Sequence, residues 1–273
     1  MRYARSIASL ALVTSTLLGV GHASAADLAA RPYTKAPIVA APVYDWTGFY
    51  IGADVGGAWN RGNLRADYLP FPLFGVDPTL TSSQGSGVIG GVYGGYNWAF
   101  ASKWVVGVEG DYSAADANST ITVIPNLAGG GAPLPAQPTT FTRNLKWLAT
   151  ARVRLGYTVA PNVLLYVTGG AAWGGLDYNG SFVNNAAGSN NWVAPFSATS
   201  SGYVVGGGGE WMLTNNWIFR AEYLFHHLGG KSNLATNPAF PAFPIQFTWN
   251  ATDTHVARVG VAYKFGGPVV ARY

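Results

Sequence analysis

Charged side chains recur at every second position in several segments of this 273-residue chain. In residues 143–159, for example, Arg152 and Arg154 alternate with Val153 and Leu155. Because successive side chains of a strand point to opposite faces, this period of two places the charges on one face. The same reading of the other segments adds further charges to that face, and the full set is Asp54, Glu109, Asp111, Lys146, Arg152, Arg154, Glu210, Arg220, Glu222, Arg258 and Lys264.

This set of five acids and six bases is nearly balanced, which favours a network of charge-assisted hydrogen bonds over catalysis. Enclosed charges of opposite sign stabilise one another, whereas an enclosed charge without a partner is strongly unfavourable. We therefore predict one closed network, in which Arg220 and Glu222 bond to charges on neighbouring strands. A passage for solutes would be more typical of a wider barrel or of an excess of one sign.

Three histidines are candidates for a second kind of chemistry. His226, His227 and His255 lie on the last two predicted strands, close to Asp253, and could hold a metal ion or act as a base at the rim of the fold. A hydrolytic enzyme would need that base beside a nucleophile, and no spacing in the chain favours one. We interpret the histidines as ordinary rim residues and predict no enzymatic activity and no metal or cofactor.

The glycine-rich segment 87–95 superficially resembles a phosphate-binding loop. It lacks the Lys-Ser or Lys-Thr ending of such loops, and no helix pattern follows it. Close packing of neighbouring strands explains these glycines better.

Eight segments show the alternation and would position the charged residues. They are Trp46–Trp59, Gly87–Trp98, Lys103–Ser113, Arg143–Val159, Asn162–Leu176, Thr199–Leu213, Trp217–Leu228 and Thr254–Phe265. Tight turns alternate with four long connections rich in Gly, Pro, Asn, Ser and Thr, which are Asn60–Ser86, Asp116–Thr142, Asp177–Ala198 and Gly229–Ala251. This asymmetry is typical of antiparallel outer-membrane barrels.

The composition supports a barrel that crosses a membrane. Hydrophobic residues make up 49% of the chain and charged residues only 10%, against about a quarter in a typical soluble domain. No apolar run after residue 20 is long enough for a spanning helix, which needs about 20 residues. A closed barrel satisfies its backbone hydrogen bonds within lipid. We predict an all-β fold, an eight-stranded antiparallel transmembrane β-barrel whose apolar face meets lipid and whose charges fill the lumen.

Aromatic residues fall where the two surfaces of a membrane would place them. Trp147 and Tyr157 are ten positions apart, roughly 33 Å along a strand and about 25 Å once the strand is tilted, which matches the apolar band of such barrels. Amphipathic rings favour membrane interfaces. The predicted interface aromatics are Trp59, Trp98, Trp104, Trp147, Tyr157, Trp173, Trp211 and Trp217.

The N-terminal end of the chain carries a signal of export. Residues 1–25 read as a signal peptide, with Arg2 and Arg5 before an apolar core and small residues before the cleavage site. Residues 26–44 form a Pro/Ala-rich linker, predicted to lie in the periplasm. Without the signal peptide the formal charge falls from +4 to about +2, which argues against a nucleic-acid partner. The absence of Cys suits passage through the periplasm.

Short motifs at three strands carry a family resemblance. With Tyr44-Asp45-Trp46-Thr47-Gly48-Phe49-Tyr50-Ile51-Gly52, Gly95-Tyr96-Asn97-Trp98 and Val261-Ala262-Tyr263-Lys264-Phe265, the chain resembles small outer-membrane β-barrel antigens of alphaproteobacteria. These antigens are similar in architecture to the OmpA transmembrane domain. The resemblance covers about residues 45–265. It implies that Tyr263 and Phe265 form the signal read by the β-barrel assembly machinery, although residues 266–273 extend past the usual terminal Phe.

The resemblance also implies a role in envelope integrity for a surface protein. We predict a structural barrel in the outer membrane, with periplasmic termini and four long surface loops, in contact with outer-membrane lipid and lipopolysaccharide. A small porin is the alternative, and a lipid-modifying enzyme that uses the histidines is a third hypothesis. The sequence leaves open whether the protein forms a homo-oligomer.

Overall fold

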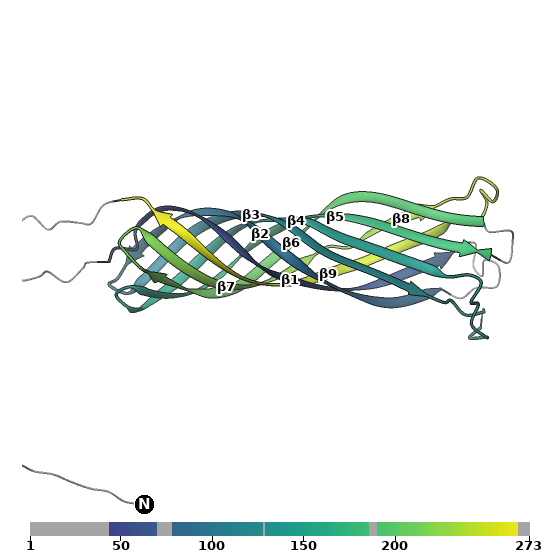
Figure 1. The fold of residues 1–273 in the computed structure, drawn as a ribbon, viewed down its shortest axis with the longest axis horizontal. Helices are drawn as coiled ribbons and strands as arrows, with labels where there is room; N and C mark the ends of the chain where they lie inside the picture. The colour runs from purple at the N-terminus through teal and green to yellow at the C-terminus, as the bar shows by residue number, and fades with distance from the viewer. Residues whose placement is uncertain (1–43, 70–77, 128, 186–189, 267–273) are drawn as a thin grey trace, which may run out of the picture. The chain divides into compact units, whose positions relative to one another are not determined.

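A computed structural model describes residues 44–69, 78–127, 129–185 and 190–266. Every described residue lies in the compact unit Pro42–Tyr273, and the predicted signal peptide and residues 26–43 of the predicted linker lie outside the described residues. In that unit one antiparallel sheet closes on itself, because its first strand pairs with both the second and the last (Figure 1). None of the described segments is a helix long and apolar enough to cross a membrane.

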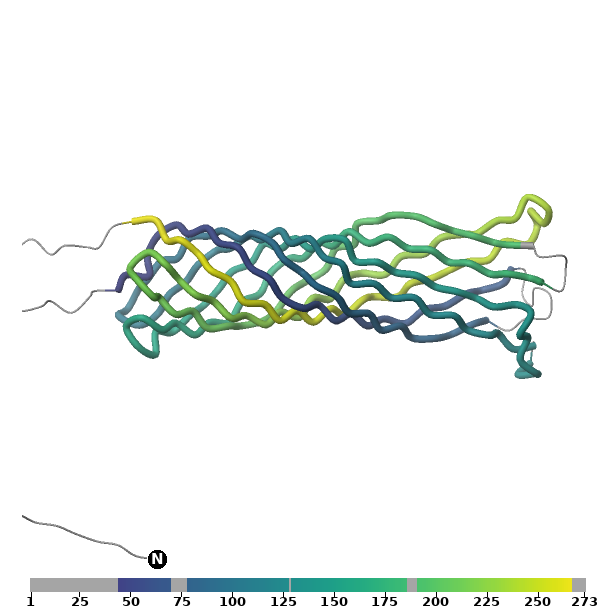
Figure 2. The backbone as a smooth tube through the Cα atoms, viewed as in Figure 1, coloured from purple at the N-terminus to yellow at the C-terminus, as the bar shows by residue number. Residues whose placement is uncertain are grey.

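The barrel consists of eight strands and one short addition. The strands are β1 Gly48–Tyr68, β2 Thr79–Phe100, β3 Trp104–Val123, β4 Thr139–Ala160, β5 Val163–Asn184, β6 Asn190–Met212, β7 Trp217–Leu228, β8 Lys231–Ala235 and β9 Ile245–Lys264. Tight turns join β2 to β3, β4 to β5 and β6 to β7 at one end, where β1 begins and β9 ends (Figure 2). We call this the turn end and the opposite one the loop end. The described sheet confirms the all-β antiparallel fold.

The prediction of four long irregular loops is wrong wherever the strands continue into them. The pairing of β1 with β2 continues to Ala66↔Thr79, that of β3 with β4 to Val123↔Thr139, and that of β5 with β6 to Asn184↔Asn190. The strands therefore run far into the segments predicted as loops. Their outward residues there are polar, as in a loop, while their inward residues alternate with them and are buried.

β8 is a strand that the sequence analysis missed. It pairs with β9 alone, from Lys231↔Trp249 to Ala235↔Ile245, and takes the place beside β9 that β7 leaves when it ends at Leu228. Five residues are too few for an alternating pattern to show. At the turn end the ring therefore consists of β1–β7 and β9.

A bulge in β4 changes which side chains point into the lumen. Leu145 and Trp147 pair with adjacent residues of β5, so Lys146 is one residue too many for the register. Arg143 and Leu145 are buried on one side of this point and Leu148 on the other. An extra residue shifts the period of two by one position. The prediction that Lys146 points inward is therefore wrong.

The lumen is filled in three layers along its axis. A large apolar cluster occupies the loop end and includes Phe141, Phe182, Trp192, Phe247 and Trp249. A smaller cluster at the turn end includes Trp46, Tyr93, Leu164, Met212 and Ile218. The charged residues lie between them. Outside, large apolar side chains such as Val92, Val153 and Val259 are exposed, which is the reverse of a soluble sheet.

Candidate functional site

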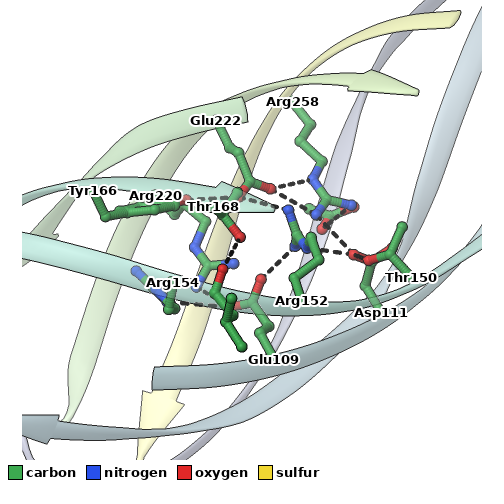
Figure 3. Close-up of polar contacts among 12 residues, drawn as sticks. Glu109, Asp111, Thr150, Arg152, Arg154, Tyr166, Thr168, Arg220, Glu222 and Arg258 are labelled. Carbon is green, nitrogen blue, oxygen red and sulfur yellow. Dashed lines mark hydrogen bonds and ion pairs between the residues drawn. The ribbon is translucent and has the colours of Figure 1, made fainter. Parts of the chain in front are cut away.

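The charged layer is formed by four arginines and five acids from six strands. Each of them is at most 8% exposed, so the layer is shielded from solvent. β1 contributes Asp54, β3 Glu109 and Asp111, β4 Arg152 and Arg154, β6 Glu210, β7 Arg220 and Glu222, and β9 Arg258. Figure 3 shows most of these side chains pointing toward one another across the lumen.

Arg152 joins opposite walls of the barrel. Its guanidinium donates a hydrogen bond to Glu109 on the neighbouring β3 and pairs with Asp111 at 3.0 Å. Its Nη1 also donates to Glu222 Oε1 at 3.0 Å, and Glu222 lies on β7. β4 and β7 are not neighbours in the sheet, so this contact crosses the lumen (Figure 3).

Arg154 and Arg220 share two carboxylates. Arg220 Nη2 donates to Glu109 Oε2 and to Glu210 Oε1, both at 2.6 Å, and its Nε reaches the same Glu210 oxygen at 2.9 Å. Arg154 pairs with Glu210 at 2.7 Å and with Glu109 at 3.2 Å. Because β3, β4, β6 and β7 all contribute, these four residues tie together strands far apart in the sequence.

Arg258 completes the layer on the side of β9 and β1. Its Nη2 and Nε donate to Glu222 Oε2 at 2.6 and 2.8 Å. It also pairs with Asp54 at 3.2 Å and with Asp111 at 3.3 Å. Every arginine of the layer thus contacts at least two acids.

Three tyrosines that the sequence analysis missed complete this layer. The guanidinium of Arg220 lies over the ring of Tyr93 at 4.1 Å, and that of Arg154 over Tyr166 at 4.0 Å, which are cation–π distances. Tyr50 donates to Glu109 Oε2 at 2.6 Å. All three occupy inward positions of the same alternation that locates the charges. The period of two could therefore have predicted that these tyrosines lie in the lumen.

Two predicted members lie outside the layer. Lys146, displaced by the bulge, is exposed, and its Nζ lies 4.0 Å from Asp177 Oδ2. The inward position predicted for it is therefore wrong. Lys264 is buried, but it lies at the turn end, where its Nζ donates to the carbonyl oxygen of Thr47 at 3.0 Å. None of the ion pairs between described residues includes Lys264.

The three histidines do not form one site. His226 is buried and faces the lumen, whereas His227 and His255 lie on the outer surface. His227 Nδ1 lies 2.6 Å from Asp253 Oδ1, and His255 Nδ1 lies 2.6 Å from the hydroxyl of Tyr223. Across the described ranges no three His, Cys, Asp or Glu residues are grouped as metal ligands would be.

The predicted interface aromatics lie on the outer surface of the barrel. Seven of them are at least 37% exposed, and Trp147 is partly covered by stacking on Tyr112 at 5.8 Å. Trp217 packs edge to face on Tyr263 at 5.3 Å, and Tyr263 packs in the same way on Phe265 at 5.3 Å. The two predicted assembly residues are therefore exposed together at the turn end; their role in assembly stays a prediction.

Comparison with known proteins agrees with this architecture. Residues 13–265 match the family described as outer membrane protein beta-barrel domain, and the match ends at Phe265, one residue after β9. The chain belongs to this family. It is 31% identical to the 31 kDa outer-membrane immunogenic protein of Brucella melitensis over 264 residues, which cover 95% of this chain and 98% of the relative.

Two further relatives are outer-membrane proteins of the same kind. The 25 kDa outer-membrane immunogenic protein of Brucella abortus is 28% identical, over 96% of this chain and all of the relative. The 22 kDa outer membrane protein of Rhizobium leguminosarum bv. viciae is 27% identical, over 82% of this chain and 80% of the relative. Among solved structures, the outer membrane protein OprG from Pseudomonas aeruginosa aligns over 83% of this chain and all of its own, with a TM-score of 0.48 and 16% identity. The barrel is an outer-membrane protein.

Proposed function

We propose that this barrel is a structural protein of the outer membrane whose lumen is closed by the charged layer. The observation that carries the proposal is the set of ion pairs that crosses the lumen, from Arg152 on β4 to Glu222 on β7 and from Arg220 on β7 to Glu109 on β3. A ring of about eight strands is only wide enough for its own side chains. With apolar clusters above and below the layer, a solute has no water-filled path along the described lumen.

The proposed topology places the turn end in the periplasm. β1 begins and β9 ends there, and a chain exported with a signal peptide would keep both termini on that side. The loop end then faces the outside of the cell. Phe265, exposed beside Tyr263, would be read by the β-barrel assembly machinery as the closing strand is inserted.

Strand length indicates that the barrel extends well beyond the membrane. The long strands have 20 to 23 residues, or roughly 66 to 76 Å along each strand and about 50 Å along an axis tilted by about 45°. An apolar band is about 25 Å tall. The outer surface of the loop end is polar, with threonine pairs such as Thr120–Thr142 and Thr122–Thr140, so this part would stand among lipopolysaccharide sugars or above them.

Conductance of refolded protein in planar bilayers tests the closed lumen. We expect wild-type protein to give little or no steady current, and Arg220→Ala to produce brief leaks because it removes a central part of the layer. The matched control is Arg65→Ala, which alters an ion pair on the outer surface at the loop end. A large, steady wild-type conductance would establish the small-porin alternative instead.

A further inference from the structure

Arg143 is a buried guanidinium in the loop-end half of the lumen. It is 1% exposed, yet each of its hydrogen-bond acceptors is neutral. Nη1 donates to Thr252 Oγ1 at 2.9 Å, and Nη2 donates to Asn60 Oδ1 at 3.2 Å and to Ser83 Oγ at 3.3 Å. Within the part of the chain that the structure describes, no ion pair joins Arg143 to a carboxylate.

The charged layer is too distant to neutralise this cation. Along β4, the residue nearest to Arg143 that bonds to the charged layer is Thr150, which donates to Asp111. Thr150 lies seven positions from Arg143, or roughly 20 Å along the strand. Around Arg143 the inward neighbours on β4 are Phe141 and Leu145, both 1% exposed. Burial lowers the pKa of Arg143, and a charged group held in such surroundings requires a counter-charge.

Three buried donors in this half of the lumen have no hydrogen-bond partner among the described residues. They are Nε of Arg143, the hydroxyl of Ser119 and the indole N–H of Trp249. Ser119 is the direct cross-strand partner of Arg143 on β3. Tyr178 is its partner on β5, and the Tyr178 ring lies 5.2 Å from that of Trp249.

Trp249 reaches this region because the register of β9 shifts beside it. Gly62 of β1 pairs with Thr252 and Leu64 pairs with Trp249, so the two β9 residues are three positions apart yet both point inward. Thr252 accepts a hydrogen bond from Arg143, and Trp249 is the next inward residue along β9. Donors from β3, β4 and β9 therefore converge on one part of the lumen.

We propose that Arg143, Ser119 and Trp249 bind one small inorganic anion of halide size. A guanidinium, a hydroxyl and an indole N–H can all donate to an anion, whereas a metal cation would be repelled by Arg143. A single positive charge matches a monovalent anion. The Nη1 edge of Arg143 packs so closely on Gly62 that a Cβ added there would collide with it, which leaves the unpartnered Nε edge for the anion. The low-dielectric surroundings strengthen the attraction.

Thermal unfolding of the refolded full-length chain tests the proposal. The midpoint is measured in sodium chloride or bromide and in sodium gluconate at equal ionic strength, over a series of halide concentrations. We expect a saturable rise of the wild-type midpoint with halide, as ligand linkage requires. Arg143→Met should abolish the dependence, and Arg65→Met, which alters an exposed arginine, should retain it.

Milder variants keep the test valid if Arg143→Met does not fold. Trp249→Phe preserves an aromatic ring and Ser119→Ala preserves the strand, and each removes one donor. Each should weaken the apparent halide affinity by about tenfold, since one hydrogen bond to a charged group is lost. Trp59→Phe, at an exposed tryptophan, is the control for Trp249→Phe. Equal halide dependence in wild type and all three site variants would overturn the proposal.

Diffraction from crystals grown in bromide gives a readout independent of stability. We expect an anomalous peak within hydrogen-bond distance of Arg143 Nε. A water molecule at that position, with no anomalous signal, would show that the donors are satisfied by water and would refute anion binding. Absence of any halide-specific change in the wild-type midpoint would refute it equally.

Discussion

Replacing Arg220 with methionine should strongly destabilise the barrel. The Arg220 side chain is 1% exposed, bonds to Glu109 and Glu210, and covers the ring of Tyr93. Methionine retains much of the volume but leaves both acids with less positive charge around them. Removing one partner of a buried ion pair costs about 3–5 kcal/mol. For a domain of this size, that corresponds to a fall of about 6–20 °C in the unfolding midpoint.

Heat-modifiable gel mobility measures this midpoint directly, because the folded barrel and the unfolded chain migrate differently. A second variant separates lost charge balance from lost packing. Arg220→Met leaves Glu210 and Glu109 with less positive charge between them, so the two carboxylates repel each other more strongly. Adding Glu210→Gln removes one of these negative charges, and we expect the double variant to recover part of the lost stability. Glu210 is the appropriate partner because it accepts two hydrogen bonds from Arg220.

Arg65→Met is the matched control, because the Arg65–Asp67 pair is on the surface with the Arg65 side chain 45% exposed. Exposed pairs contribute about 0–1 kcal/mol. If Arg220→Met and Arg65→Met lowered the midpoint equally, or if the double variant were less stable than the sum of the single changes, the view of the layer as a mutually neutralising network would be wrong.

Three further predictions concern assembly, topology and pH. Phe265→Ala should reduce insertion of the barrel into the outer membrane more than deletion of residues 266–273 does, as measured by the folded fraction in membranes. The opposite order would locate the assembly signal at the C-terminus. An epitope inserted between Gly129 and Gly130, in the connection of β3 to β4, should bind antibody on intact cells, and labelling only after permeabilisation would reverse the topology. Burial raises the pKa of Tyr68, so the unfolded chain ionises first and stability should decline as the pH rises above about 10. Urea unfolding at pH 9 and 11 should show a smaller decline for Tyr68→Phe than for wild type, and an equal decline would contradict this assignment.

Alternation alone located most of the charged layer, because a strand has only two faces and charge on the lipid face is costly. Arg152, Arg154, Arg220 and Arg258 and all five acids lie where the period of two puts them. Lys146 does not, because a bulge inserts one residue and inverts the phase beyond it. Periodicity measured within one strand contains no information about its partner's register, so neither this bulge nor the inward position of Arg143 could be found from the sequence.

The extent of the strands was underestimated for a different reason. Within the membrane, lipid makes the outward residues apolar, and the alternation is easy to see. Beyond it, outward residues such as Thr120, Thr122 and Thr142 face water and resemble loop residues. Their inward neighbours Ser119 and Arg143 are polar as well, although they are buried. With polar residues on both faces, inward and outward positions differ little in polarity, so no period of two is visible. The glycine and proline content of these segments then favoured the prediction of a loop.

The charged layer also gives the barrel a means of selecting its register. A slip of β4 by one residue would turn Arg152 and Arg154 toward lipid and Val153 toward the lumen. An arginine at the middle of the membrane costs about 2–4 kcal/mol on the lipid face of a barrel, so two would cost more than most single mutations. The slip would also leave Glu109, Glu210 and Glu222 without part of their positive charge. Each arginine bonds to acids on at least two other strands, so a register error in one strand would break ion pairs with several strands at once. The observed register is the one in which all these ion pairs form together.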